Sequence, residues 1–245
     1  MAILTVLWEK WIEFKHEWLK ITGTAMISPI LYLLTFGLGL GMDKVVDGHS
    51  YMAFLIPGII ALTTMNASFN AIGMSLNVQR LYEKSFDNVL ASPTPLGQYI
   101  IGQMIGGSLR GMYAGSLILG IAYIFGAPIQ VNLIFFLVML LNGMAFSALG
   151  VMAAIISKTH ADISRFSTFV ILPMTFIGNT FFPVANMPSL LKSVVQVLPL
   201  THSSSLLRQI SYGEPASLAS FFIMVVYTIV FMVVALIKIN ISKNL

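Results

Sequence analysis

The stretch FFPVANMPSLLKSVVQVLPLTHSSSLLRQISYGEP, residues 181–215, interrupts a chain that is otherwise apolar almost throughout. It contains four prolines and a run of three serines, and its apolar pattern at 187–198 is too short to span a bilayer, which takes about 20 residues. Pro199 breaks that segment, and a second short helix is expected at 201–212. The pattern predicts two short helices that re-enter the membrane packed on protein, with a structured outer loop as the alternative.

The composition indicates an all-α membrane protein. The chain has 245 residues, of which 57% are hydrophobic and 9% are charged, whereas soluble domains carry about 25% charged residues. So few charges cannot cover a water-facing surface, and we expect a single transmembrane domain over residues 1–245. The formal net charge of +4 comes mostly from Lys and Arg beside apolar runs, so it predicts no nucleic-acid partner. The absence of cysteine excludes disulfides and thiolate metal sites.

Six apolar runs predict about six transmembrane helices. They lie near residues 21–41, 52–76, 98–125, 131–156, 166–182 and 217–237. If the N-terminus is cytoplasmic, nine Lys and Arg side chains fall in inside segments and three in outside segments, while Arg110 lies within a span. Because positive residues accumulate on the cytoplasmic side, this asymmetry predicts that both termini are cytoplasmic and that residues 183–215 are extracellular.

Residues 3–20, ILTVLWEKWIEFKHEWLK, form an amphipathic pattern ahead of the first span. One face collects apolar side chains at helical spacing: Leu4, Leu7, Trp8, Trp11, Phe14 and Trp18. We therefore expect a separate interfacial helix along the cytoplasmic headgroups, with its tryptophans at the boundary with water. The alternative adds a contact between its acidic face and a cytoplasmic partner.

The loop between the second and third predicted spans contains a further amphipathic helix, predicted at residues 78–92. Its apolar face combines Leu81, Phe86, Val89 and Leu90. The sequence Ser-Pro-Thr-Pro at 92–95 ends the helix, because a residue before proline is pushed out of the α region. Such a helix either lies on lipid or inserts its apolar face into a groove on a soluble partner.

Polar residues within the spans mark a second candidate region. In and just after the second span, polar and small residues recur at spacings of three and four and predict a continuous stripe: Thr63, Asn66, Asn70, Gly73 and Asn77. The stripe suits either a subunit interface or the wall of a conduit for an amphipathic substrate. Arg110 must face protein or a hydrated path, because exposure to lipid costs at least about 2.5 kcal/mol. Arg110 therefore either makes a structural contact or lies in the translocation path.

The absence of certain residue types argues against some classes of transporter and enzyme. All nine Asp and Glu and all four His fall outside the predicted spans. An ion-coupled carrier usually needs an ionisable group near mid-membrane, so this class is disfavoured. The chain also lacks the G-x-x-x-x-G-K-[ST] pattern of a P-loop, and we expect neither enzyme activity nor a directly bound cofactor.

Two motifs resemble those of the membrane subunits of type-2 ABC exporters. The opening stretch contains Phe181-Phe182-Pro183, Met187-Pro188, Leu198-Pro199-Leu200-Thr201-His202 and Arg208, in the order and spacing of that family. The run KSFDNVLASP at 84–93 resembles the family's coupling helix, although Ser85 stands where many members have Gly-Thr. The run LPLTHS resembles most the branch that exports Nod factors and daunorubicin.

The resemblance implies a transmembrane subunit of an ATP-driven exporter, which moves a drug, glycolipid or polysaccharide outward across the inner, cytoplasmic membrane. It implies a separate P-loop ATPase subunit that binds ATP-Mg, and a second permease copy in a homodimer or heterodimer. A non-transport scaffold or assembly factor and an ion-coupled carrier are the alternatives. The substrate is not identified.

The candidate residues fall into three sets. The ATPase-coupling residues are Glu83, Ser85, Phe86, Asp87 and Leu90. The residues of the translocation path or subunit interface are Asn66, Asn70, Asn77 and Arg110. The residues of an extracellular gate are Phe182, Pro183, Pro199, His202 and Arg208.

Overall fold

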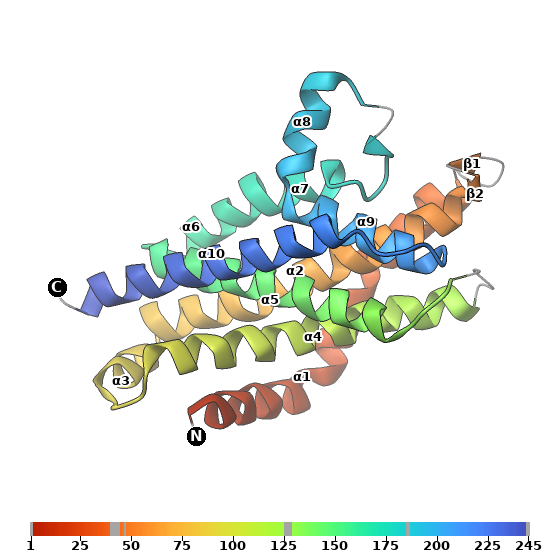
Figure 1. Ribbon diagram of the computed structural model, residues 1–245. Coiled ribbons are helices and arrows are strands. Elements are labelled where there is room, and N and C mark those ends of the chain that lie inside the picture. The colour runs from red at the N-terminus through yellow and green to blue at the C-terminus, as the bar shows by residue number, and fades with distance from the viewer. Residues whose placement is uncertain (1, 40–44, 47, 125–128, 185–186, 244–245) are drawn as a thin grey trace.

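The computed structural model describes residues 2–39, 45–46, 48–124, 129–184 and 187–243, which form an elongated helical bundle (Figure 1). The long helices are α1 (Ala2–Tyr32), α2 (Tyr51–Leu81), α4 (Leu96–Ile124), α5 (Leu133–Ile156) and α10 (Leu218–Lys243). The short helices are α3 (Ser85–Ala91), α6 (His160–Phe166), α7 (Leu172–Ile177), α8 (Ser189–Val197) and α9 (Pro199–Ser211). Two π-helical segments, η1 (Leu33–Leu38) and η2 (Ser167–Ile171), and a small antiparallel hairpin of β1 (Val45–Val46) and β2 (His49–Ser50) complete the described part.

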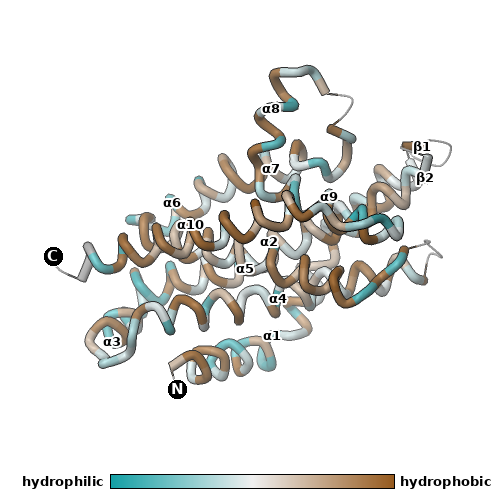
Figure 2. Tube along the Cα trace, in the orientation of Figure 1, coloured by the Kyte–Doolittle hydropathy of each residue, from teal (hydrophilic) through white to brown (hydrophobic). Residues whose placement is uncertain are grey.

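Helix α2 forms the centre of the bundle. It packs against α4, α5 and α9, and α10 covers the other side of α5. Small residues allow the central helices to approach closely. A Cβ atom added to Gly111 of α4 would lie 2.7 Å from the backbone oxygen of Thr64 in α2, so only glycine fits there. Helix α10 is apolar along most of its length, as Figure 2 shows, and Phe222, Val226 and Ile229 are exposed, which suits contact with lipid.

Four helices in the described part are long and apolar enough to cross a membrane: Ala2–Gly37, Tyr51–Leu81, Leu133–Ile156 and Leu218–Asn240. Together they make the chain an all-α membrane protein. They overlap the predicted spans 21–41, 52–76, 131–156 and 217–237, of which residues 40–41 lie outside the described part. The spans predicted at 98–125 and 166–182 correspond to α4, which contains Arg110, and to the series α6, η2 and α7. Neither is among the four, so these two spans stay predictions.

The structure corrects the separation of residues 3–20 from the first span. Helix α1 continues from Ala2 through Tyr32 and passes directly into η1. The residues that join its two parts include no proline, and the helix tolerates Gly23, so nothing in the backbone ends it there. In Figure 1 the first half of α1 runs along α4, and the chain then turns behind α4.

The helix predicted at 78–92 is also divided differently. Residues up to Leu81 belong to α2, and α3 covers only Ser85–Ala91. The break occurs at Lys84, whose φ of 58° and ψ of 10° place it in the left-handed region. Ser92 then ends α3 in an extended conformation before Pro93.

The opening stretch contains two short helices, α8 and α9, close to the predicted 187–198 and 201–212. Pro199 begins α9, where its missing N–H costs nothing, while Leu198 is extended and separates the two helices. The hairpin, α9 and the start of α10 lie at one end of the bundle, called here the α9 end (Figure 1). The start of α1, α3, the connection from α5 to α6 and the end of α10 lie at the opposite, α3 end.

Candidate functional site

Arg110 of α4 pairs with a carboxylate of α1. Its Nη1 lies 3.3 Å from Oε1 of Glu13, and the other carboxylate oxygen of Glu13 accepts a bond from Lys10 Nζ at 2.9 Å. Lys10 also donates to Oγ of Ser75 in α2 at 2.9 Å. The network therefore joins α1, α2 and α4. Arg110 therefore makes a structural contact, which was one of the two alternatives drawn from the sequence.

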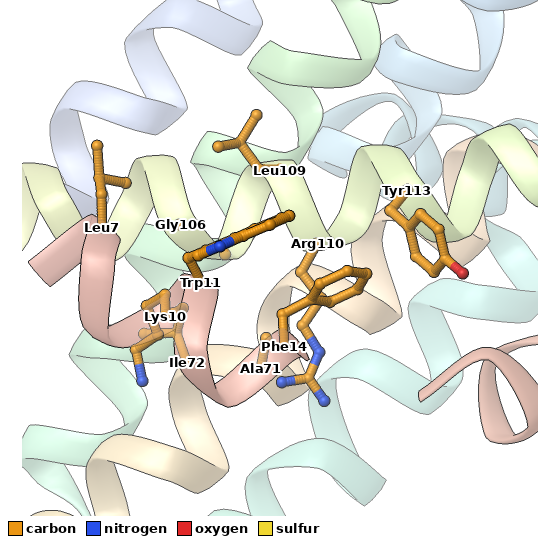
Figure 3. Close-up of a pocket in the computed structure, with 11 residues that line it drawn as sticks. Leu7, Lys10, Trp11, Phe14, Ala71, Ile72, Gly106, Leu109, Arg110 and Tyr113 are labelled. Atoms are coloured by element: carbon orange, nitrogen blue, oxygen red, sulfur yellow. The ribbon is translucent and has the colours of Figure 1, made fainter. Parts of the chain in front are cut away.

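Arg110 also lines three adjoining cavities. The first, of about 450 Å³, is apolar and lies between α1 and α4, with Trp11, Phe14 and Tyr113 in its wall (Figure 3). The second, of about 430 Å³, has a mixed polar and apolar lining and faces α2; because it carries several polar side chains, we call it the polar cavity. Its polar lining consists of Thr24, Ser28, Thr63, Asn66, Asn70 and Arg110. The third, of about 710 Å³, carries the carboxylates of Glu9, Glu13, Glu17 and Glu83.

The predicted polar stripe is divided between two environments. Asn66 and Asn70 line the polar cavity, but Asn77 is fully buried and its Oδ1 accepts a bond from Nδ1 of His160 at 3.0 Å. Toward the α3 end the third cavity is lined by Met74, Ser75, Val78 and Gln79 of α2 and not by Asn77. The prediction of one continuous stripe is therefore wrong, because the element that covers the Asn77 face of α2 is α6 rather than α1.

At the α9 end, Arg208 is enclosed by backbone. Only 7% of the residue is exposed. Its Nε donates to the carbonyl of Phe54 at 3.1 Å and its Nη2 to the carbonyl of Asn179 at 2.9 Å. The guanidinium also lies 3.7 Å from the centre of the Phe54 ring. Arg208 thus anchors α9 both to α2 and to the turn that follows α7.

The two phenylalanines of the opening stretch have opposite roles. Phe181 is fully buried against the rings of Tyr32, Phe36 and Phe176, and its carbonyl accepts a bond from the Tyr51 hydroxyl at 2.9 Å. Phe182, which is 52% exposed, was selected from the sequence as a gate residue, whereas the buried Phe181 was not. A pair of identical adjacent residues does not indicate which of them faces the core.

The remaining gate candidates lie around α8 and α9. Pro199 is buried at the start of α9, and Pro183 is half-buried. His202 contacts two neighbouring elements: its Nε2 donates to the carbonyl of Gln196 at 2.9 Å, and its Nδ1 lies 3.4 Å from Oγ of Ser220. It therefore connects α9 with the end of α8 and the start of α10.

The coupling candidates on and beside α3 do not share one exposed surface. Phe86 is 4% exposed and packs toward Tyr99 of α4, with ring centres 5.9 Å apart. Leu90 is half-buried in the same core. The side chains of Glu83 and Asp87 face solvent. The prediction that Phe86 fills a groove on a partner is therefore wrong, because this chain's own core already encloses the ring.

Ser85 lies at the first turn of α3, where its hydroxyl is 3.3 Å from a carboxylate oxygen of Glu83. Arg80, which precedes α3, was interpreted from the sequence as an inside positive charge and as part of the polar face of the helix predicted at 78–92. Its Nη1 lies within hydrogen-bond distance of three carbonyl oxygens at the end of α5: Ala154 at 2.7 Å, Ile155 at 2.8 Å and Ser157 at 2.9 Å. No periodicity could have indicated this contact, because its partners are backbone atoms 74 to 77 residues away.

Comparisons with known proteins place these features in one family. The profile described as ABC-2 type transporter matches residues 1–212, which include both the α3 motif and Arg208. Nodulation protein J of Rhizobium meliloti (strain 1021) is 30% identical over 212 residues, covering 84% of this chain and 80% of that protein. Nodulation protein J of Rhizobium leguminosarum bv. trifolii is 31% identical over 213 residues, covering 85% and 81%.

A third relative covers a larger share of the chain. The inner membrane transport permease YadH of Escherichia coli (strain K12) is 27% identical over 235 residues, covering 93% of this chain and 91% of that protein. The resemblance to the membrane subunits of type-2 ABC exporters, near the Nod-factor branch, is confirmed. The chain belongs to the ABC-2 type transporter family.

Proposed function

We propose that this transmembrane subunit forms one half of an exporter pathway that moves an amphipathic or lipid-linked substrate outward across the inner membrane. Membership of the ABC-2 family supports ATP-driven transport. The similarity to YadH, an inner membrane transport permease, supports the same membrane for this chain. The family also argues against a non-transport scaffold, which has no reason to keep both family motifs.

The observation that carries the substrate class is the position of Arg110. It lines an apolar cavity and a polar cavity at once, so a molecule with an apolar tail and a hydroxylated headgroup could contact both. Thr63 supports the polar side, since its Oγ1 is buried without a hydrogen-bond partner among the described residues. Asn66 and Asn70 supply further donors and acceptors there.

The same surface suits a second copy of the subunit. A polar groove on one side of a membrane bundle is costly next to lipid, and a facing copy would enclose it. We therefore propose that two permease copies, identical or related, form the path between them. Two P-loop ATPase subunits would bind ATP-Mg and carry out its hydrolysis.

The proposed orientation places the α3 end and both termini in the cytoplasm, with α8 and α9 re-entering the outer leaflet. The exposed apolar side chains of α8 suit that position, because Leu190, Val194 and Val197 are each more than half exposed. The first half of α1 would lie along the cytoplasmic headgroups, with exposed Trp8 and Trp11 at the boundary.

The ATPase would dock on the solvent-facing side of α3. Glu83 and Asp87 are exposed there, while Phe86 holds α3 on α4. Exposed carboxylates suit basic groups on a partner and affect partner choice and association rate more than total affinity. Asp87→Ala should therefore leave the complex assembled but impair the coupling of ATP hydrolysis to transport.

Topology can be tested by cysteine labelling, because the chain has no cysteine of its own. Gln196 on the polar side of α8 and Asn88 of α3 are both exposed. An impermeant thiol reagent should label Gln196→Cys from outside and Asn88→Cys only after the membrane is opened. The reverse pattern would overturn the orientation. Ser203 is unsuitable for this test, since it is fully buried.

The transport function is tested by purification from the native membrane, identification of the co-purifying chains and reconstitution in vesicles made with native lipid extract. We expect a P-loop ATPase to co-purify and its hydrolysis to be stimulated by an amphipathic lipid fraction. Arg110→Leu should remove the stimulation while keeping the complex. Transport driven by an ion gradient without any ATPase would favour the ion-coupled carrier and overturn the proposal.

A further inference from the structure

The last turns of α2 are fixed to the region where α5 ends and α6 begins. Arg80 donates to the carbonyl groups of Ala154, Ile155 and Ser157, as described above. One turn earlier, Asn77 accepts a hydrogen bond from His160, the first residue of α6. We call these contacts, made by Asn77 and Arg80, the α2 clamp.

The α2 clamp replaces contacts that the end of α5 cannot make by itself. The last carbonyl groups of a helix have no partner within the helix, and a basic side chain can bind them. Ala154, Ile155 and Ser157 are all buried, so water cannot easily take the place of Arg80. The two segments therefore move together or lose these bonds.

The α2 clamp lies close to α3 in the chain. Only three residues, 82–84, separate α2 from α3. Tyr82 in that turn also lies near the His160 ring, with centres 6.4 Å apart. A displacement of α3 is therefore passed to the end of α2, from there through Arg80 to the end of α5 at Ser157, and through the bond between Asn77 and His160 to the start of α6.

The segment that begins at α6 leads to the opposite end of the bundle. It continues through η2 and α7 to Asn179, whose carbonyl accepts from Arg208 of α9. The segment is therefore held by α2 at one end and by α9 at the other. The π-helical turn η2 lies between the two attachments, and such turns often occur at functional sites.

We propose that Arg80 is a positioning residue for transport, which transmits displacement of the ATPase-docking helix α3 to the α6–α7 segment and thereby to the α9 end. This inference rests on the proposed function, because it requires an ATPase at α3. Arg80 does not touch the substrate path, since it lines none of the three cavities around Arg110. Its loss should uncouple the two ends without detaching the ATPase.

The experiment places a reporter next to α8, the helix that leads directly into α9, in the reconstituted complex. Met187, just before α8, is half-buried, so a cysteine there reports movement in either direction through its rate of thiol labelling. The measured quantity is the change in that rate when ATP is added, recorded together with ATP hydrolysis and with the amount of bound ATPase. No transported substrate has to be known.

Arg80→Gln removes the charge and most of the donors. We expect the ATPase to remain bound and active, and the ATP-dependent change in labelling to fall by about fivefold or more. Arg80→Lys should restore part of the response, because a lysine keeps the charge but offers a different donor geometry. Arg165→Gln is the matched control, since Arg165 lies in the same region, is exposed, and pairs only with half-buried Asp162 at 3.0 Å among the described residues. It should leave the response unchanged.

A parental response in Arg80→Gln would overturn the proposal. If that variant fails to insert, His160→Ala removes the other half of the α2 clamp and carries the test, and a parental response in both His160→Ala and Arg80→Lys would overturn the proposal equally. Absence of any co-purifying ATPase would instead refute the proposed function. A complex with active ATPase but no ATP-dependent labelling in the parent would refute the relay alone.

Discussion

Arg208 at the α9 end and Arg110 in the groove are both enclosed by helices, yet their surroundings differ. Arg208 is bound by backbone carbonyl groups and an aromatic face, whereas the Arg110 side chain is 25% exposed, pairs with Glu13 and borders three cavities. Backbone carbonyls cannot move away without local unfolding, but a carboxylate on a flexible side chain can exchange partners. The comparison predicts that Arg208 supports the fold and that Arg110 acts at the cavities proposed for the substrate.

The largest expected effect comes from Arg208→Leu. It leaves the buried carbonyls of Phe54 and Asn179 without their donor, and we expect the protein to lose about 3 kcal/mol or more of stability. Thermal unfolding in detergent, followed by size-exclusion fluorescence, measures the loss. Arg208→Lys should recover only part of it, because lysine cannot reproduce the planar geometry. A Leu variant as stable as the parent would remove Arg208 from the scaffold.

Phe181 and Phe182 provide a second comparison, between a buried and an exposed residue that are adjacent in the chain. Phe181→Ala opens a cavity beneath Tyr32 and Phe36 and should cost about 3 kcal/mol. Phe182→Ala removes a half-exposed ring and should change stability by less than about 0.5 kcal/mol. The same unfolding measurement applies to both. Equal losses would mean that both rings belong to the packed core.

Arg110→Leu should produce the opposite combination of results. Its pair with Glu13 is partly exposed, so we expect a stability change of about 1 kcal/mol or less, together with loss of lipid-stimulated ATP hydrolysis. Arg110→Lys should be partly active. Unchanged stimulation in the Leu variant would show that Arg110 serves only to hold α1 against α4.

The smallest effect is the direct coupling between Arg110 and Glu13. A double-mutant cycle with Arg110→Gln and Glu13→Gln should give an interaction of about 0.5 kcal/mol, which decreases as salt increases because the pair is partly exposed. Stability of the four proteins at two salt concentrations provides the measurement. A coupling of several kcal/mol, independent of salt, would make Arg110 resemble Arg208.

The pattern of apolar and polar residues along the chain was sufficient to predict much of the helical structure. Apolar runs of membrane length predicted the long helices, and short amphipathic patterns bounded by prolines predicted α8 and α9. These features depend on neighbouring residues and on the length of a bilayer, which a sequence displays directly. The family also followed from ordered motifs around Pro183 and Pro199 and was confirmed by the ABC-2 match.

The errors and omissions share one cause. The burial of Phe86, the choice between Phe181 and Phe182 and the diversion of Asn77 toward His160 all depend on which helix covers a given face. Periodicity shows that a helix has faces, but it does not show which neighbour packs on each. The prediction of a separate first helix failed in a similar way: the amphipathic pattern ends at residue 20, but helix α1 continues beyond it.

The sequence alone determined that this chain is a helical membrane protein of a transporter family, because hydropathy and motif order are properties of consecutive residues. Tertiary structure alone decided the roles of its arginines. Arg110 meets Glu13 across 97 residues, and Arg208 meets the carbonyl of Phe54 across 154. Arg80 binds backbone oxygens that any residue type would offer. Such contacts arise from packing between distant segments, so no local pattern records them.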